Sequence, residues 1–335
     1  MIFFRADGNS TIGLGHLMRC FAIASEMDKN IVCFLCADEQ SADIVKSRGF
    51  KTCVLGAVAF SKKEALIVSE ICQKEKERPT VVIDSYLVSK EYTGHVSKNA
   101  AVVCMDDIYA EYENVDGIIN YNSYADSNNY HIEGVKLMTG AQYVPLRKEF
   151  RGHEELIRNN FEKILISTGG ADPQNLAYKI TDRLLNNEIL KNKEIHIICG
   201  RMNQNRDELE NLADKYINVS VHVDVKNMSQ LMAECDIAVS AGGSTCYEMC
   251  AMGLPFIVFS FADNQRMLAN DMGNRGGAIY AGHIGKDSDP VLNKIEESLL
   301  RIENDKNILR LMSMKGHEVV DGNGAGRLAK ELLSI

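Results

Sequence analysis

The stretch Asp236–Pro255, with the sequence DIAVSAGGSTCYEMCAMGLP, decides the fold. It opens with Ile237–Val239, an apolar run that is too short for a helix and has the length of a buried parallel strand. Ser240–Gly243 follows as a tight turn without bulky side chains. The residues Thr245–Met252 favour a helix, which Gly253 ends. The stretch therefore predicts a strand, a glycine turn and a helix in succession.

The start of this helix has the features of an anion site. Ser244 or Thr245 is the predicted N-cap. Backbone N–H groups of the Gly-Gly turn can approach a ligand closely, and a helix N-terminus favours an anion, usually phosphate. Glu248, one turn into the helix, can accept hydrogen bonds from vicinal hydroxyls of a sugar. An ordinary strand–helix turn without a ligand has the same pattern, so this stretch alone leaves both interpretations open.

The length of the chain predicts two domains. At 335 residues and 37.2 kDa it exceeds the size at which one hydrophobic core usually keeps growing. The net charge of −9 argues against nucleic acid or an anionic membrane as partner. Because Met1 leads directly into a strand and no apolar run is long enough for a membrane span, we expect neither a signal peptide nor a membrane anchor. The ten cysteines mostly lie in apolar patterns, which predicts free structural thiols in a reducing, cytoplasmic setting.

Strands and helices alternate along the chain, which predicts α/β domains with doubly wound parallel sheets. In the first half, Ile2–Arg5 is the first expected strand and Gly117–Asn120 the last. The charged stretch Arg147–Asn160 is the expected linker and a hypothetical hinge. We therefore expect an N-terminal domain over residues 1–150 and a C-terminal domain over 160–320. A terminal helix at 321–335 follows without a further strand and is expected to pack back on the first domain.

Polar residues gather where the expected strands end. Parallel strands place their carboxyl ends at one edge, where open α/β sheets bind ligands. The two domains are expected to face each other across a shared cleft lined by these residues. The segments concerned are Asp7–His16, Asp84–Tyr86, Asp106–Asp107, Thr168–Asp172, Ser240–Glu248 and Asn264–Gln265.

His16 is the main catalytic candidate of the first loop. The loop does not match a dinucleotide-binding fingerprint, because Met18 stands where the third glycine is required. Gly13 and Gly15 bring His16 to the start of a helix, where a neutral imidazole can act as a general base. A histidine that only binds phosphate or caps the helix fits the same position.

Other residues suggest no further chemistry. Arg5, Asp7 and Arg19 are candidate structural ion partners, and Arg19 could also face the cleft. No nucleophile elbow is present. The remaining histidines lack companions at metal-ligand spacing, so we expect no metal site. These are His95, His131, His153, His196, His222, His283 and His317.

With these motifs in place, the chain resembles the UDP-sugar hydrolases of pseudaminic acid biosynthesis, which are nucleotide-sugar enzymes of the GT-B fold. The resemblance runs nearly end to end. It rests on Arg5-Ala6-Asp7, Ile12–His16 with Arg19, Ile83–Tyr86, Met105–Asp107, Gly140–Tyr143, Leu146–Phe150, Thr168–Asp172, Ser240–Thr245 with Glu248, and Asn264-Gln265.

The resemblance implies a GT-B-like fold with two Rossmann-like domains, and hydrolysis of UDP-2,4-diacetamido-2,4,6-trideoxy-β-L-altropyranose without cofactor or metal. It implies that His16 activates water and that Tyr86 orients substrate or water. Glu248 would hold the ribose, and Gly242, Gly243, Ser244 and Thr245 the diphosphate. The other substrate-binding residues it implies are Asp7, Gly15, Arg19, Gly169, Gly170, Asn264 and Gln265.

Three alternatives remain open from the sequence. A GT-B glycosyltransferase would use the same UDP site and transfer the sugar to an acceptor. A UDP-sugar 2-epimerase would need further catalytic acids, and a nucleotide-sugar sensor would bind without turnover. The sequence fixes neither the sugar, whose specificity we expect in loops such as Tyr121–Tyr130, nor the oligomeric state, with which a monomer is compatible.

Overall fold

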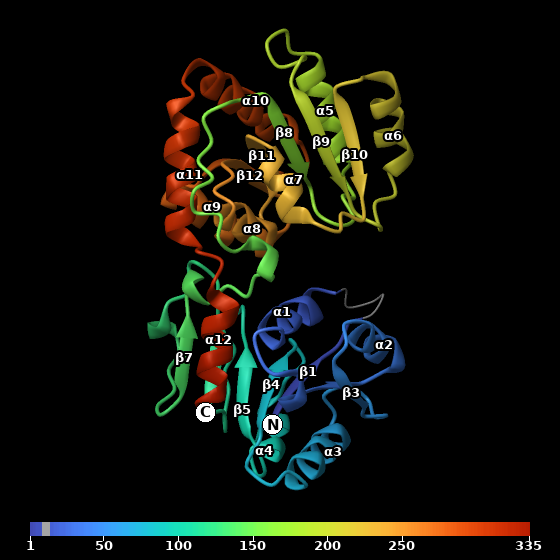
Figure 1. The fold of residues 1–335 in the computed structure, drawn as a ribbon, viewed down its shortest axis with the longest axis vertical. Coiled ribbons are helices and arrows are strands. Elements are labelled where there is room, and N and C mark those ends of the chain that lie inside the picture. Colours follow the sequence, from blue (N-terminus) through green and yellow to red (C-terminus); the bar gives the residue numbers. More distant parts are fainter. Residues whose placement is uncertain (9–13) are drawn as a thin grey trace. The chain divides into compact units, whose positions relative to one another are not determined.

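The computed structural model describes residues 1–8 and 14–335 and divides the chain into two compact units (Figure 1). Unit 1 comprises Met1–Arg147 together with Asn323–Ile335, and unit 2 comprises Lys148–Gly322. Each unit has its own parallel sheet. The predicted α/β class with parallel sheets is therefore confirmed.

Unit 1 is built on a seven-stranded sheet in the order β3-β2-β1-β4-β5-β6-β7, and all of its strand pairs are parallel. The order runs outward in both directions from β1, as in a doubly wound sheet. The strands are β1 (Ile2–Ala6), β2 (Val32–Cys36), β3 (Lys51–Val54), β4 (Thr80–Asp84), β5 (Ala101–Met105), β6 (Gly117–Asn120) and β7 (Lys136–Thr139).

Helices cover both faces of this sheet, so its central strands are apolar on both sides. In β4, Val82 belongs to one core cluster, whereas Val81 and Ile83 belong to the other. The side of Val82 includes residues of α1 (Gly15–Ala24), α2 (Glu39–Ser47) and α12 (Gly324–Leu333), and the opposite side includes residues of α3 (Lys62–Gln73) and α4 (Lys90–Val96). Short 3₁₀ turns lie at Lys29–Ile31, Ser127–Asn129 and Ala141–Tyr143.

The C-terminal helix α12 completes the core of unit 1. Its residues Leu328, Ala329 and Leu332 are buried in the same cluster as Met138 of β7 and Leu17 of α1. Figure 1 shows α12 beside β7, where Glu331 pairs with Lys136 at 2.5 Å, and at the opposite end of the colour scale from β1. The last residues of the chain are therefore an integral part of its first unit.

Unit 2 has a six-stranded parallel sheet in the order β10-β9-β8-β11-β12-β13. Its strands are β8 (Lys163–Ser167), β9 (Glu194–Cys199), β10 (Val219–Val223), β11 (Ile237–Ala241), β12 (Phe256–Ser260) and β13 (Ala278–His283). Its helices are α5 (Leu176–Leu185), α6 (Arg206–Lys215), α7 (Met228–Glu234), α8 (Thr245–Ala251), α9 (Asp263–Arg275), α10 (Asp289–Asn304) and α11 (Asn307–Val319), with a 3₁₀ turn at Lys148–Phe150.

The Asp236–Pro255 stretch forms β11, a turn and α8, as its sequence predicts. Ser244 is the N-cap residue, but its backbone is helical and its side chain makes no capping hydrogen bond. The predicted N-cap position is therefore confirmed, although its side chain does not cap the helix. The position of the turn is set by Gly242, whose N–H donates to Phe259 O of β12 at 2.8 Å.

The sequence prediction missed two strands, β7 and β13. The sequence predicts Gly117–Asn120 as the last strand of the first half, yet β7 follows it at the sheet edge. Three of the four residues of β7 are only half-buried, and β13 contains Gly282 with positive φ beside a register shift. Edge strands of this kind lack the long apolar run that identifies a buried strand.

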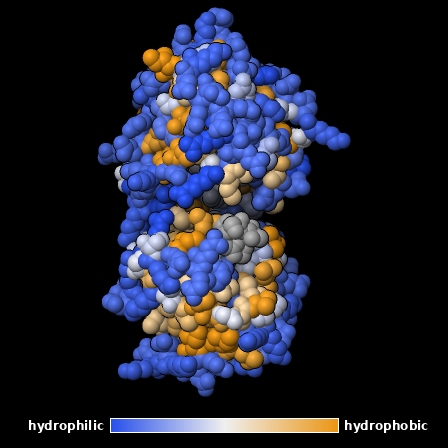
Figure 2. All heavy atoms as spheres, turned by 90° about the vertical axis from the view of Figure 1, so that its right-hand side faces the viewer, coloured by the Kyte–Doolittle hydropathy of each residue, from blue (hydrophilic) through white to orange (hydrophobic). Residues whose placement is uncertain are grey.

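Apolar and polar side chains are mixed over the face of the molecule shown in Figure 2. None of the helices within the described residues is long and apolar enough to cross a membrane.

Candidate active site

His16 is the second residue of α1, and its imidazole meets the carboxylate that ends β4. His16 Nδ1 lies 2.7 Å from Asp84 Oδ1. Strand β4 pairs with β1 in parallel, with Ala6 opposite Asp84, so the loop that follows β1 starts beside this carboxylate. Gly13, predicted to shape the same loop, lies outside the described residues.

Charge determines where the proton of this pair resides. Burial alone would raise the pKa of Asp84, but the Arg19 guanidinium and the His16 imidazole outweigh burial and hold that pKa below its usual range. An ionised carboxylate only accepts hydrogen bonds, so His16 Nδ1 must carry the donated proton. In the neutral imidazole, Nε2 then keeps its lone pair. The side chain of His16 is 14% exposed. This tautomer gives His16 the form of a general base.

Arg19, one turn further along α1, holds two carboxylates in place. Its Nε donates to Asp84 Oδ2 at 2.5 Å, and its Nη1 lies 3.2 Å from both oxygens of Asp107. Nη1 also donates to Tyr121 Oη at 2.8 Å. Burial alone would lower the pKa of Arg19, but Tyr121, Asp84 and Asp107 raise it well above its usual value. Arg19 therefore stays charged and positions Asp84; its predicted role in binding substrate remains a prediction.

Tyr86 packs edge-on against His16, with ring centroids 5.3 Å apart. Its hydroxyl donates to Asp107 Oδ2 at 2.5 Å. Burial of the phenol and the Asp107 carboxylate both raise the pKa of Tyr86, so the phenol keeps its proton at neutral pH. This contact brings the predicted catalytic pair, His16 and Tyr86, to one place in unit 1.

Asp7 has structural partners in this fold. Its Oδ2 accepts from Arg5 Nη1 at 2.7 Å, and its Oδ1 accepts from the backbone N–H of Ala37 at 2.8 Å. Arg5 is fully buried and makes a bidentate pair with Glu64 at 2.8 and 2.9 Å. These contacts agree with the interpretation of Arg5 and Asp7 as ion partners. Substrate binding by Asp7 and Gly15 remains a prediction.

The turn after β11 has room for a side chain at Gly243 but not at Gly242. A Cβ on Gly242 would lie 2.9 Å from Gln265 O, whereas a Cβ on Gly243 would meet nothing within 4 Å. Ser244 is exposed, and Thr245 and Glu248 are half-buried in the first turn of α8. The backbone at Gly243 is thus accessible beside Ser244 and Thr245.

A second glycine turn follows β8. Gly169 has φ +92°, and a Cβ there would meet nothing within 4 Å. Gly170 lies so close to Gly200 that a Cβ on Gly200 would fall 2.2 Å from Gly170 O. The Asp172 carboxylate accepts from Leu176 N and Ala177 N at the start of α5. This turn belongs to unit 2, like the turn at Gly242–Gly243.

Asn264 and Gln265 lie in the first turn of α9, and the N-cap residue of this helix is Ala262. Gln265 Oε1 accepts from Phe261 N at 3.0 Å, and Asn264 is exposed. Their predicted contact with substrate remains a prediction.

Three site residues were not assigned roles from the sequence: Asp84, Asp107 and Tyr121. Each follows or ends a buried strand, which is the only sequence signal they share. The structure unites them through Arg19.

A further cluster of titratable side chains lies in unit 2. His196 Nδ1 and His222 Nε2 are 3.0 Å apart on β9 and β10, a pairing that the sequence pattern does not predict. Within residues 1–8 and 14–335, no group of three or more histidine, cysteine or acidic residues is arranged to hold a metal ion.

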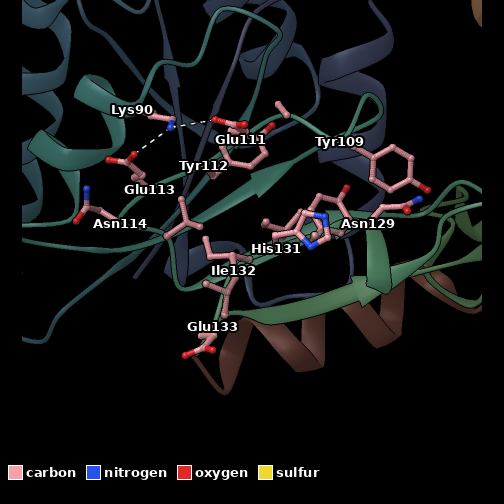
Figure 3. A pocket seen from close by; sticks show the side chains of 15 residues that line it. Lys90, Tyr109, Glu111, Tyr112, Glu113, Asn114, Asn129, His131, Ile132 and Glu133 are labelled. Carbon is pink, nitrogen blue, oxygen red and sulfur yellow. Dashed lines mark hydrogen bonds and ion pairs between the residues drawn. The ribbon is translucent and has the colours of Figure 1, made fainter.

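A cavity of about 800 Å³ lies in unit 1 between the loops 109–115 and 129–133 (Figure 3). None of the predicted site residues lines it. Three of the charged residues that line it form ion pairs, since Lys90 contacts Glu111 at 3.2 Å and Glu113 at 2.9 Å. We therefore place the candidate active site at His16 and its partners, and not at this cavity.

One prediction concerns the stability contributed by Asp84. Because its pKa in the folded state is below the ordinary 3.8, its ionised form stabilises the fold above that pH, and this contribution is lost as pH falls through the folded-state value. We expect the difference in unfolding free energy between the native chain and Asp84→Asn to shrink below about pH 4. Urea unfolding from pH 7 to pH 3 measures it; a difference that is constant with pH would contradict the assignment.

The fold defines the class of protein: the chain has the GT-B fold. Acinetobacter baumannii MurG matches 100% of this chain and 99% of its own with a TM-score of 0.71 at 15% identity. An S. aureus MnaA–UDP structure matches 99% and 95% with a TM-score of 0.66 at 10% identity. A UDP-GlcNAc 2-epimerase from Neisseria meningitidis, bound to UDP-GlcNAc, covers 100% of both chains with a TM-score of 0.63 at 12% identity.

Sequence comparison narrows the class. Residues 163–322 match the glycosyltransferase family 28 C-terminal domain. The chain is 24% identical to the UDP-2,4-diacetamido-2,4,6-trideoxy-β-L-altropyranose hydrolase of Campylobacter jejuni, over 82% of this chain and 97% of that protein. It is 27% identical to an uncharacterized protein of Methanocaldococcus jannaschii, over 79% of this chain and 56% of that protein. The predicted resemblance to these hydrolases is confirmed.

Proposed function

We propose that the protein hydrolyses a UDP-linked sugar, and that the sugar nucleotide is UDP-2,4-diacetamido-2,4,6-trideoxy-β-L-altropyranose of pseudaminic acid biosynthesis. The observation that carries the proposal is the contact between His16 Nδ1 and Asp84, which leaves Nε2 as a base. The resemblance to the Campylobacter jejuni hydrolase supports the choice of substrate.

In the proposed reaction, His16 Nε2 takes a proton from water as the water oxygen attacks the anomeric carbon. The bond from this carbon to the diphosphate oxygen breaks, the sugar gains the hydroxyl, and UDP leaves with the bonding electrons. Asp84 stabilises the imidazolium that forms and keeps the ring oriented. Tyr86, with its hydroxyl held by Asp107, orients the water or the sugar. No step requires a metal ion.

Unit 2 is proposed to bind UDP. The diphosphate would contact Gly242, Gly243, Ser244 and Thr245, and Glu248 would hold the ribose. Gly169, Gly170, Asn264 and Gln265 would line the remainder of the nucleotide and sugar site. The open space at Gly243 and Gly169 supports this assignment, and so does the UDP named in two structures of the same fold.

The two glycines after β11 provide a matched test of UDP binding. Gly243→Ala adds a methyl group into open space, so we expect an unchanged melting temperature but UDP binding weakened about tenfold or more, because the methyl blocks the backbone. Gly242→Ala would clash with Gln265 O and is expected to lower the melting temperature instead. Calorimetric titration with UDP and thermal unfolding measure both; full UDP affinity in Gly243→Ala would contradict the site.

The experiment that tests the function is phosphorus NMR of the protein with the diacetamido-trideoxy-altrose nucleotide in EDTA, with and without a sugar acceptor. Release of UDP and free sugar without acceptor is the expected result. No release in any condition, with binding intact, would favour a nucleotide-sugar sensor. Release that stops in EDTA would contradict the metal-free mechanism.

A glycosyltransferase is the second candidate, since unit 2 matches a glycosyltransferase family 28 domain. It would use the same UDP contacts and deliver the sugar to a hydroxyl of an acceptor. UDP release that depends on the acceptor would establish it in place of the hydrolase.

A further inference from the structure

Four large exposed apolar side chains lie within three residues in sequence of His16, Asp84 or Asp107. Leu14 precedes α1 and is 49% exposed, and Tyr86 and Leu87, after β4, are 61% and 63% exposed. Ile108, after β5, is 63% exposed. We name these four residues the apolar rim.

The contacts within unit 1 place the rim beside the candidate base. Tyr86 contacts the His16 ring, and its hydroxyl is held by Asp107, the residue before Ile108. Strands β4 and β5 are paired with Asp84 opposite Met105, so the loops carrying Leu87 and Ile108 start side by side. The rim residues therefore come from three separate segments that meet at one edge of the sheet.

Their gathering at one place is the informative feature, because single exposed apolar side chains are ordinary on protein surfaces. The other large apolar residues of unit 1 that are exposed are dispersed over the loop before α3, α3 itself and the two chain ends; they are Met1, Val58, Leu66 and Leu333. Within the described residues of unit 1, it is the edge that carries His16 that combines several of them with charged groups held in largely buried ion pairs. That combination is typical of a ligand site, in which apolar walls surround a few oriented polar groups.

We propose that the apolar rim selects sugars whose substituents end in methyl groups. This inference rests on the proposed function and specifies which residues choose the substrate. A 2,4-diacetamido-2,4,6-trideoxy sugar carries two acetamido methyls and a methyl at carbon 6, and its ring keeps a single free hydroxyl at carbon 3. An ordinary hexose presents hydroxyls at these positions instead.

The chemistry of the rim side chains gives the direction of selection. Leucine and isoleucine side chains offer no hydrogen-bond partner, so a hydroxyl pressed against them loses its water without replacement. A methyl group in the same place gains from leaving water. The Tyr86 hydroxyl donates its proton to Asp107, so toward a ligand it can only accept a hydrogen bond, and the rest of the side chain is an apolar ring. The rim therefore favours the deoxy, acetamido sugar over a hydroxylated one.

The test uses the double variant Leu87→Gln/Ile108→Thr in the full chain and two nucleotide sugars. These are the UDP-diacetamido-trideoxy-altrose and UDP-GlcNAc, which has one acetamido group and free hydroxyls at carbons 3, 4 and 6. We expect the ratio of their affinities, measured by calorimetry, to fall about tenfold or more in the variant. The affinity for UDP alone should stay unchanged. Val58→Thr, which changes an exposed valine outside the rim, is the matched control and should leave the ratio unaltered.

Two outcomes would overturn the proposal. One is a variant with the native ratio of affinities. The other is a shift in sedimentation from an assembled to a monomeric form with the ratio intact, which would make the rim an interface between copies of the chain. Because the readout is binding, it remains decisive even if the native protein fails to hydrolyse either nucleotide sugar. The experiment therefore distinguishes an incorrect assignment as a hydrolase from an incorrect assignment of sugar selection to the apolar rim.

Discussion

His16→Asn is expected to lower kcat for UDP release by about 10²–10⁴-fold, because it removes the group that takes the proton from water. The affinity for UDP should change little, since the proposed UDP contacts all lie in unit 2. Asparagine keeps a polar side chain near Asp84, so the fold is expected to survive the change. Single-turnover hydrolysis followed by phosphorus NMR, with calorimetric titration of UDP, measures the two quantities separately.

His131→Asn is the matched control for this experiment. His131 is an exposed histidine of the same unit and lines the cavity between loops 109–115 and 129–133 rather than the His16 cluster. It should hydrolyse the substrate at the native rate. Native activity in His16→Asn would rule out the base assignment and, with it, the mechanism proposed for this site.

Asp84→Asn is expected to lower kcat by about 10²–10³-fold with a smaller effect on KM. An asparagine amide can donate to His16 Nδ1, which favours the tautomer with the proton on Nε2 and so removes the base. It also takes away the charge that would stabilise the imidazolium during proton transfer. Arg19 keeps Asp107 as a partner, so its charge is not left isolated.

The comparison variant is Asp107→Asn, which alters a contact of Arg19 and Tyr86 but leaves the contact of His16 with Asp84 in place. We expect a smaller loss of kcat than in Asp84→Asn. Steady-state kinetics of both variants, with circular dichroism to verify folding, provide the test. Equal losses in the two variants would show that the carboxylates act only by holding Arg19.

The central strands could be predicted because burial on both faces makes their sequences apolar throughout. That signal located β1 to within one residue of its bounds and β11 to within two. It failed for β7 and β13, where an edge position and a glycine interrupt the pattern. The positions of turns could be predicted better than their hydrogen bonds. Ser244, for example, is the N-cap residue of α8, but its side chain makes no capping hydrogen bond.

The active-site histidine could be found from the sequence, but its partner could not. His16 and Asp84 are 68 positions apart, and their contact depends on β4 lying next to β1. The order of the strands along the chain does not show which strands pair in the sheet. In this sheet β1 lies between β2 and β4. The role of Arg19 in joining Asp84 to Asp107 likewise follows only from the assembled sheet.

The place of α12 in unit 1 has a consequence for how the chain is made. Unit 2 is continuous and precedes the segment Asn323–Ile335, so a ribosome can deliver all of unit 2 before that segment. The segment Met1–Arg147 of unit 1 is made earlier, but it lacks Leu328, Ala329 and Leu332 of its core until those residues have been made. The Met1–Arg147 segment must therefore keep part of its apolar surface uncovered while unit 2 is synthesised.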